Sequence, residues 1–208
     1  MTDQKLLNVF NPAMENKIVS KYLGLLKKYH RETYEHSLRV GLLCVYFGLE
    51  NNLSNKKIKL LCLAGLLHDV GKLNISKKIL SKTTKLNSCE LEKIHEHPRR
   101  AFLILGREKL FEVRKIIVMH HEFCSCSYPR GGADRRKTKR FERRQENGYG
   151  ELAQMLCVAD EYDALSHKRS YHKALGCREI EKILKEQFKG KKKYINQVMK
   201  KCLIDFKK

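Results

Sequence analysis

An apolar segment that runs directly into two ionisable side chains sets the main constraint on how this chain can fold. Residues 58–67 are apolar on nearly every side of a helix, and His68 and Asp69 follow at once. A helix of this character belongs at the centre of a helical bundle. An imidazole and a carboxylate at its end would be buried, where an unpaired charge is costly. We therefore expect partners of opposite charge, or metal ions, to gather around His68 and Asp69.

The remainder of the chain also reads as helical. Its 208 residues include only 12 glycines and 3 prolines, so turn signals are scarce, and no segment has the clean alternation of a strand. Apolar residues recur at helical spacing, and the predicted helices cover residues 16–29, 32–49, 54–67, 75–80, 87–97, 111–120, 152–165, 178–187 and 194–203. Ser54 and Asn87 are the expected N-caps, and Pro98 is expected to bend or restart its helix. The predicted class is an all-α bundle of roughly seven to nine helices.

A single domain over residues 1–208 is the expected organisation. Within it, residues 1–14 read as a lead-in, 123–149 as a basic loop and 178–208 as C-terminal helices. No segment reaches the ~18 uninterrupted apolar residues of a membrane span. The first ten residues lack the basic and apolar pattern of a secretion signal, so we expect a cytoplasmic protein.

The net charge of +21 is large for a chain of this size. Residues 130–145 hold eight Lys or Arg against two acids, and residues 181–208 hold ten against three. Such a field attracts nucleic acid, an anionic membrane surface or a phosphorylated substrate. A solvated basic surface explains the charge equally well, so contact with a polyanion through these two segments is one of two open interpretations.

The eight cysteines do not predict a disulfide framework, because no export signal accompanies them. Cys44, Cys62 and Cys157 lie in apolar runs and read as small buried hydrophobic residues. Cys124 and Cys126 lack the two-residue gap of a typical zinc knuckle, so we favour an ordinary loop over a thiolate metal site there.

Imidazoles and carboxylates recur where a helical bundle could bring them together. Taken singly, a histidine on an apolar stripe, such as His36 or His97, is more often a satisfied core residue than a ligand. The order in which these residues recur along the chain favours a metal-ligand role over that interpretation. Helical spacing favours it too, since residues four apart share one face of a helix. The candidate metal ligands are Glu32, His36, His68, Asp69, His97, His120, His121 and Asp160.

Imidazole and carboxylate donors without thiolates suit catalytic zinc, iron, manganese or nickel. Eight ligands are too many for one ion, and two or three divalent ions fit the count, with Asp69 able to bridge a pair. Such a pair lowers the pKa of a bridging water, and the resulting hydroxide can attack phosphorus. Lys72 could hold a phosphate oxygen, Asp163 could accept a proton or orient substrate, and Arg169 could bind a second phosphate or a base edge.

The sequence resembles the HD superfamily of metal-dependent phosphohydrolases, and within it the HD-GYP branch. The resemblance spans about residues 32–173. It rests on ordered motifs: Glu32-Thr33 with His36-Ser37-Leu38-Arg39-Val40, the stretch from Ala64 to Lys72 that contains His68-Asp69-Val70-Gly71-Lys72, Ile79-Leu80-Ser81-Lys82 with Lys85-Leu86, Glu96-His97-Pro98, His120-His121-Glu122, Tyr128-Pro129-Arg130-Gly131, and Val158-Ala159-Asp160-Glu161-Tyr162-Asp163-Ala164-Leu165 with Arg169 and Tyr171. A bare His-Asp pair is a weak signal, whereas the ordered set is a specific one.

The resemblance implies a helical HD fold around a multinuclear metal site, often of iron or manganese. It implies hydrolysis of cyclic di-GMP to the linear dinucleotide or GMP. All eight candidate ligands match the family's metal ligands, with Glu32 matching the ligand that marks trinuclear members. Lys72, Asp163 and Arg169 match positions that contact substrate.

One segment departs from the family's pattern. After His120-His121-Glu122 the family has Asp-Gly and then Gly-Tyr-Pro, but residues 123–127 lack the Asp-Gly, and Ser127 replaces the glycine. Serine adopts positive φ less readily than glycine, so we expect a different loop shape. Two alternatives stay open beside cyclic di-GMP hydrolysis. One is an HD phosphohydrolase for another nucleotide, and the other is a non-catalytic module that binds nucleotide or nucleic acid.

Overall fold

The computed structural model describes residues 3–125, 148–167 and 174–205, with side chains placed within residues 4–200. The described residues confirm the all-α class: they contain helices, and their β-structure is limited to an isolated bridge between Cys124 and Phe188. The helices are α1 (Asp3–Met14), α2 (Lys17–Tyr29), α3 (Arg31–Glu50), α4 (Asn55–Leu67), η1 (Val70–Asn74), α5 (Lys77–Leu80), α6 (Ser88–His95), α7 (His97–Ile104), η2 (Leu105–Arg107), α8 (Phe111–Met119), η3 (His120–Phe123), α10 (Tyr149–Ser166), α11 (Cys177–Gln187) and α12 (Lys193–Asp205).

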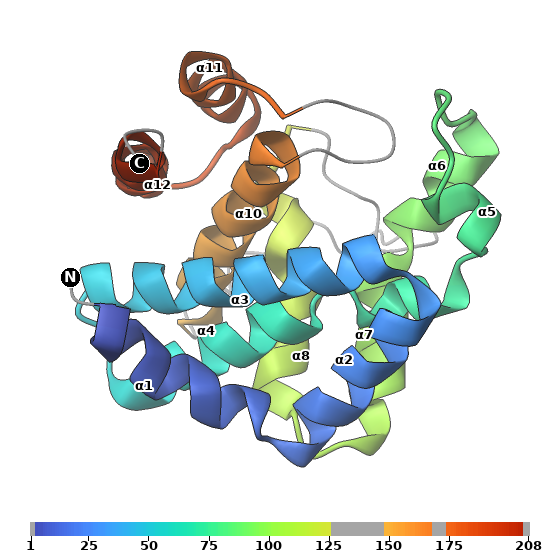
Figure 1. Cartoon of the computed structure of the whole chain (residues 1–208), viewed down its shortest axis with the longest axis horizontal. Coiled ribbons are helices and arrows are strands. Elements are labelled where there is room, and N and C mark those ends of the chain that lie inside the picture. Colours follow the sequence, from blue (N-terminus) through green and yellow to red (C-terminus); the bar gives the residue numbers. More distant parts are fainter. Residues whose placement is uncertain (1–2, 126–147, 168–173, 206–208) are drawn as a thin grey trace.

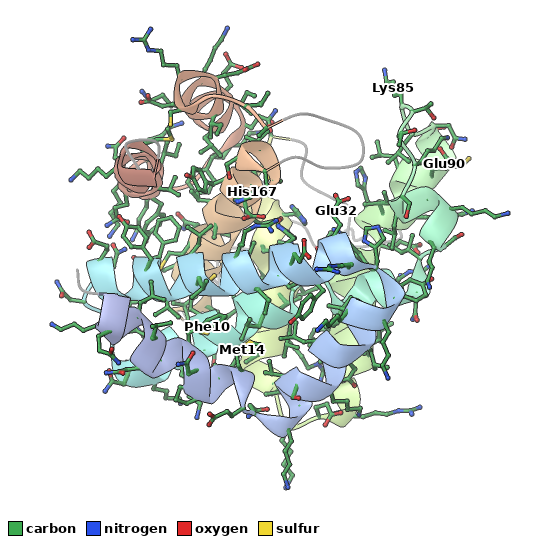
Figure 2. The ribbon with its side chains drawn as sticks, in the orientation of Figure 1. Phe10, Met14, Glu32, Lys85, Glu90 and His167 are labelled. Atoms are coloured by element: carbon green, nitrogen blue, oxygen red, sulfur yellow. The ribbon has the colours of Figure 1, made fainter. Side chains whose placement is uncertain are left out.

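The N-terminal segment is a helix and not the expected lead-in. Phe10 and Ala13 of α1 are buried, and Met14 packs against the same core. Figure 2 shows Phe10 and Met14 between α1 and the rest of the bundle. The segment is too short and too polar for its apolar spacing to stand out, and Pro12 lies inside it. The helix expected over residues 87–97 is also followed by a separate helix, so that α6 ends at His95 and α7 begins at His97. With α1 added, the described residues contain more helical segments than the seven to nine expected.

The predicted helix starts have a clear physical basis in two cases. The side chain of Asn16 accepts hydrogen bonds from the backbone N–H groups of Ile18 and Val19 at the start of α2. Asn87 and Glu90 form the expected reciprocal capping box at the start of α6. Ser54 occupies the predicted N-cap position of α4, although its side chain makes no capping hydrogen bond.

Helices α3 and α4 form the centre of the bundle. In Figure 1 the long helix α3 crosses the middle of the view, with α1 and α2 on one side and α10 rising on the other. Glycines permit the close approach of α3 and α4, since a Cβ on Gly65 would lie 2.8 Å from Sγ of Cys44 and 3.0 Å from Cα of Gly41. The apolar segment that ends at His68 is therefore buried, as predicted.

A second close approach positions the start of α7. A Cβ on Gly71 would overlap the carbonyl oxygen of His97 and would lie 2.7 Å from the backbone nitrogen of Ala101. Only a residue without a side chain allows η1 and α7 to pack this tightly. The packing brings His97 beside the end of α4, where His68 and Asp69 lie.

Several sequence predictions concern segments beyond the core. Residues 130–145 lie outside the described residues, as do Cys126 and Arg169. Cys177 is disulfide-bonded, which the sequence does not predict, whereas Cys44, Cys62, Cys89, Cys124 and Cys157 are free. In the described part of the chain, no helix has both the length and the apolar character needed to cross a membrane.

Candidate metal centre

Seven of the eight predicted ligands converge at one place in the bundle. His36 comes from α3, His68 and Asp69 from the end of α4, His97 from the start of α7, His120 and His121 from η3, and Asp160 from α10. Their donor atoms form three overlapping triplets, each with all atoms within 4.8 Å of one another. The triplets are His36, His68 and Asp69; His68, His120 and Asp160; and His97, His120 and His121.

Three of the histidines share one local geometry. Nδ1 of His68 lies 2.8 Å from the carbonyl oxygen of Gly65, and Nδ1 of His97 lies 2.8 Å from that of Ile94. Nδ1 of His120 lies 2.5 Å from the carbonyl oxygen of Ile117. A carbonyl only accepts, so each Nδ1 carries the proton, and each Nε2 presents a lone pair. This is the tautomer that a metal ligand requires.

His36 is oriented by a carboxylate instead of a carbonyl. Its Nδ1 lies 2.7 Å from Oδ2 of Asp163 and its Nε2 lies 2.9 Å from Oδ1 of Asp160. Arg39 in turn donates to both oxygens of Asp163, at 2.7 and 3.0 Å. Asp163 thus fixes the ring of His36 from behind, in the arrangement that often supports metal-binding histidines.

The cluster leaves buried polar atoms unsatisfied. Nε2 of His68, Nε2 of His120 and Oδ1 of Asp69 are buried without a hydrogen-bond partner. Such atoms cost free energy unless something compensates them. They converge on the same small volume, and imidazole nitrogens with carboxylate oxygens are suitable ligands for divalent transition metals. The residues present therefore fit a metal group of the kind that the sequence predicts.

Two carboxylates at the centre are held in their charged form. Burial alone would raise the pKa of Asp69, but Lys72 and the neighbouring histidines outweigh it and lower that pKa well below its usual value. Nζ of Lys72 donates to Oδ2 of Asp69 at 2.7 Å. The pKa of Asp160 is likewise well below its usual value, because His36 and His68 outweigh the effect of burial. Both groups are anionic acceptors for a cation.

Three histidines of the cluster are held neutral. Burial is the main cause that lowers the pKa of His97 to about 3 and that of His120 to about 4. Burial also lowers the pKa of His121 well below its usual value. A neutral imidazole is the form that donates a lone pair to a metal, so the protonation state suits ligation at neutral pH.

The structure places the other predicted site residues differently. Glu32 lies in the first turn of α3 and is not part of any of the three triplets. It lines a cavity of about 560 Å³ together with Lys72, Lys82 and Lys85. In Figure 2, Glu32 and His167 lie on the same side of α3 and Lys85 projects from the far end of this region.

Asp163, which is expected to accept a proton or orient substrate, lies behind His36. The residue is fully buried, and both of its oxygens are occupied by His36 and Arg39. Burial alone would raise its pKa, but hydrogen bonds from His167, His36 and Arg39 outweigh this and lower the pKa below its usual value. In this structure the contacts of Asp163 with Arg39 and His36 hold the ring of His36 in place.

Sequence reasoning overlooked two features of this region. Arg39 lies three residues after His36 on the same face of the helix, and this spacing is the sequence signal for its place beside that histidine. Cys124, Cys157 and Glu161 also form a compact group beside the metal centre. Their separation in sequence and the apolar context of Cys157 gave no indication of that contact.

Residues 33–165 match the HD domain family, which is more than half of the chain and includes every residue of the three triplets. The chain belongs to the HD domain family. This confirms the resemblance that the sequence motifs indicated, and the HD domain accounts for the His68-Asp69 pair at the centre of the site.

Individual relatives narrow the comparison. The chain is 31% identical to a cyclic di-GMP phosphodiesterase of Pseudomonas aeruginosa over 157 residues, which are 74% of this chain and 35% of that protein. The identity is 32% to a cyclic di-GMP phosphodiesterase of Thermotoga maritima, over 74% of this chain and 40% of that protein. The identity to 3'3'-cGAMP-specific phosphodiesterase 1 of Vibrio cholerae is 29%, over 74% of this chain and 34% of that protein. The chain thus spans between about a third and two fifths of the length of these relatives.

Proposed function

We propose that this chain is a metal-dependent phosphodiesterase of HD-GYP type that hydrolyses cyclic di-GMP to the linear dinucleotide or GMP. The observation that carries the proposal is the buried cluster of oriented Nε2 atoms and charged carboxylates, found in a chain whose relatives are named as cyclic dinucleotide phosphodiesterases. Two or three divalent transition-metal ions fit the overlapping triplets, with iron or manganese preferred and zinc or nickel as alternatives.

The proposed ligands are His36, His68, Asp69, His97, His120, His121 and Asp160, with Glu32 available to a further ion at the mouth of the site. When bound, the ions would supply an activated water and neutralise the charge that grows on the phosphate. The protein holds the ligands ready by its own contacts, through backbone carbonyls behind three histidines and Asp163 behind His36. Little rearrangement is then needed for binding.

The substrate is proposed to occupy the cavity beside the cluster. Lys72 contacts Asp69 and also lines that cavity, so its ammonium group lies between the metal ligands and the space for substrate. It is positioned to hold a non-bridging phosphate oxygen. Lys82 and Lys85 add positive charge to the same cavity, which attracts a second phosphate. Arg169 is proposed to contact substrate as well and lies outside the described residues.

A specific observation favours a second substrate. Relatives from Vibrio cholerae are named as 3'3'-cGAMP-specific phosphodiesterases, and their identity to this chain is 29–33%. The departure from the family's loop pattern after Glu122 falls where substrate preference could change. We therefore keep 3'3'-cGAMP as the alternative substrate.

The test is a parallel measurement of hydrolysis and metal content. The full chain, loaded with iron or manganese, would be assayed with cyclic di-GMP, 3'3'-cGAMP and nucleoside monophosphates, and the same sample would be analysed for metals. We expect two or three ions per chain and hydrolysis of a cyclic dinucleotide. Asp69→Ala should abolish turnover, whereas Glu50→Ala on the exposed end of α3 should leave it intact. A metal-loaded protein that binds cyclic dinucleotide without hydrolysing it would favour the non-catalytic alternative.

Contact with a polyanion through residues 130–145 and 181–208 is a further proposal. In the described part of the second segment, Lys182, Lys189 and Lys193 are exposed. Phosphate contacts release counterions, so binding should weaken steeply as salt rises. The probe is a single-stranded oligonucleotide titrated at 50 and 200 mM salt, with a triple Lys-to-Gln variant of these three residues as the comparison. Equal affinity in both proteins would reject a role for this segment.

A further inference from the structure

Two thiols and a carboxylate meet beside the histidine cluster, outside its triplets. Sγ of Cys124 lies 3.2 Å from Sγ of Cys157, and the Cys124 thiol donates to Oε1 of Glu161 at 2.5 Å. The three donor atoms lie within 4.8 Å of one another. Both cysteines are buried and free, and Glu161 is partly buried.

Local structure fixes each member of this group. Cys157 and Glu161 are four residues apart on α10, so the helix places both on one face, one turn apart. Cys124 follows η3 and is held on both sides by backbone hydrogen bonds. Lys189 N–H donates to Phe123 O at 2.7 Å, and Ser125 N–H donates to Gln187 O at 2.7 Å. The juxtaposition therefore results from rigid elements and not from a chance contact of long side chains.

The group leaves an acceptor atom without a partner. Among the described residues, Oε2 of Glu161 is buried and makes no hydrogen bond. Two polarisable sulfur atoms and a carboxyl group converge there. Sulfur donors select thiophilic ions such as zinc, whereas the histidine cluster next to them offers no thiolate.

We propose that Cys124, Cys157 and Glu161 form a second cation site, for a thiophilic divalent ion of the zinc class. Binding exchanges the two thiol protons for the ion: the Zn²⁺ forms two Zn–S bonds and a bond to the carboxylate, and two protons pass to solvent. No electrons are transferred. Three protein donors leave a fourth position for water.

The proposed site would connect η3 and α10, the two elements that hold His120, His121 and Asp160. Cys124 comes directly after η3, which holds His120 and His121, and Cys157 lies one turn before Asp160 on α10. An ion bound here would fix the distance between η3 and α10 without using any ligand of the histidine cluster. Its role would be to brace the catalytic ligands.

The experiment uses cobalt as the probe. The full chain, stripped by a chelator without a reductant that would open the disulfide of Cys177, is titrated with Co²⁺ and followed in the near ultraviolet, where thiolate-to-cobalt charge transfer absorbs. We expect a charge-transfer band that saturates with cobalt. Cys124→Ser should abolish the band, and Glu161→Gln should weaken Co²⁺ affinity at this site by about tenfold or more, because an anionic donor is lost.

Matched variants separate this site from the histidine cluster and from other thiols. Asp69→Ala should keep the band while it loses phosphodiesterase activity, so the two proposals can fail independently. Cys89→Ser, at an exposed free thiol, should also keep it. Cys157→Ser tests the second sulfur, and circular dichroism reports whether this buried variant folds; Cys124→Ser and Glu161→Gln decide the matter if it does not. Absence of the band in the wild-type chain, or an unchanged band in Cys124→Ser, would overturn the proposal.

Discussion

Nδ1 of His36 donates a 2.7 Å hydrogen bond to Oδ2 of Asp163, and the two residues are separated by 127 positions in the sequence. Both side chains are buried, and Arg39 neutralises the carboxylate from the same helix as His36. The contact leaves Nε2 of His36 directed at Asp160. Helices α3 and α10 are thereby joined at the point where the metal ligands meet.

Asp163→Asn should weaken the metal centre without removing a ligand. An amide still accepts a hydrogen bond from His36, but it lacks the charge that makes the imidazole a stronger donor. Loss of such a supporting carboxylate typically costs about 10–100-fold in metal affinity or activity. Competition with a chelator of known affinity measures the first quantity directly. If the variant binds metal as tightly as the wild-type chain, Asp163 does not act through His36.

Gly71→Ala should destabilise the fold more than its small size suggests. The added Cβ would meet the backbone of His97 and Ala101, which cannot move without shifting α7. Overpacking of this kind costs about 1–3 kcal/mol. Gly24→Ala in the exposed face of α2 is the matched control, since a Cβ there meets nothing within 4 Å. That control should stabilise by up to about 1 kcal/mol. Urea denaturation of both variants gives the comparison, and equal midpoints would contradict the packing argument.

Lys72→Met should lower turnover while metal content stays constant. The ammonium group contacts Asp69 and faces the cavity, so its removal takes away a donor for the phosphate but none of the ligands. Removal of one electrostatic donor in an active site typically costs about 10²–10³-fold in kcat. Steady-state kinetics with cyclic di-GMP, together with metal analysis of the same sample, provide the measurement. Lys78→Met, at an exposed position of α5, should be neutral. A metal-depleted Lys72→Met protein would show that Lys72 supports the ligands instead.

Sequence alone predicted most of the helices and the convergence of histidines with carboxylates, for a physical reason. Helix boundaries depend on local caps and spacing, as at Asn16 and Asn87, and ligand identity depends on residue type. Relations between distant helices leave little trace in one sequence. The position of Asp163 behind His36 and the contact of Cys124 with Cys157 follow from how α3, η3 and α10 pack. The helix at residues 3–14 was overlooked because its buried face is short and polar residues surround it.

Glu151→Gln should reduce the loss of folding stability that the chain undergoes as the pH falls from 7 into the acid range. Oε1 of Glu151 accepts from Nζ of Lys191 at 2.9 Å and from the hydroxyl of Tyr194 at 2.8 Å, which links α10 to α12 and the segment before it. Lys191 is the main cause that lowers the pKa of Glu151 below its ordinary value of 4.5. A folded-state pKa below that of the unfolded chain contributes stability that is present above about pH 4.5 and is lost as the pH falls through the folded-state value.

At pH 7 the variant should therefore be less stable by about 0.5–1 kcal/mol, a modest value because the pair is partly exposed. The difference should shrink as the pH falls below about 4.5, since the wild-type carboxylate is then protonated as well. Urea denaturation of the metal-free proteins at pH 7 and in acid measures both quantities. Glu181→Gln, which removes an exposed helical pair with Lys185, is the control and should change stability less at either pH. A Glu151→Gln deficit that stays constant into acid would mean that packing around Tyr194, and not the charge, sustains this contact.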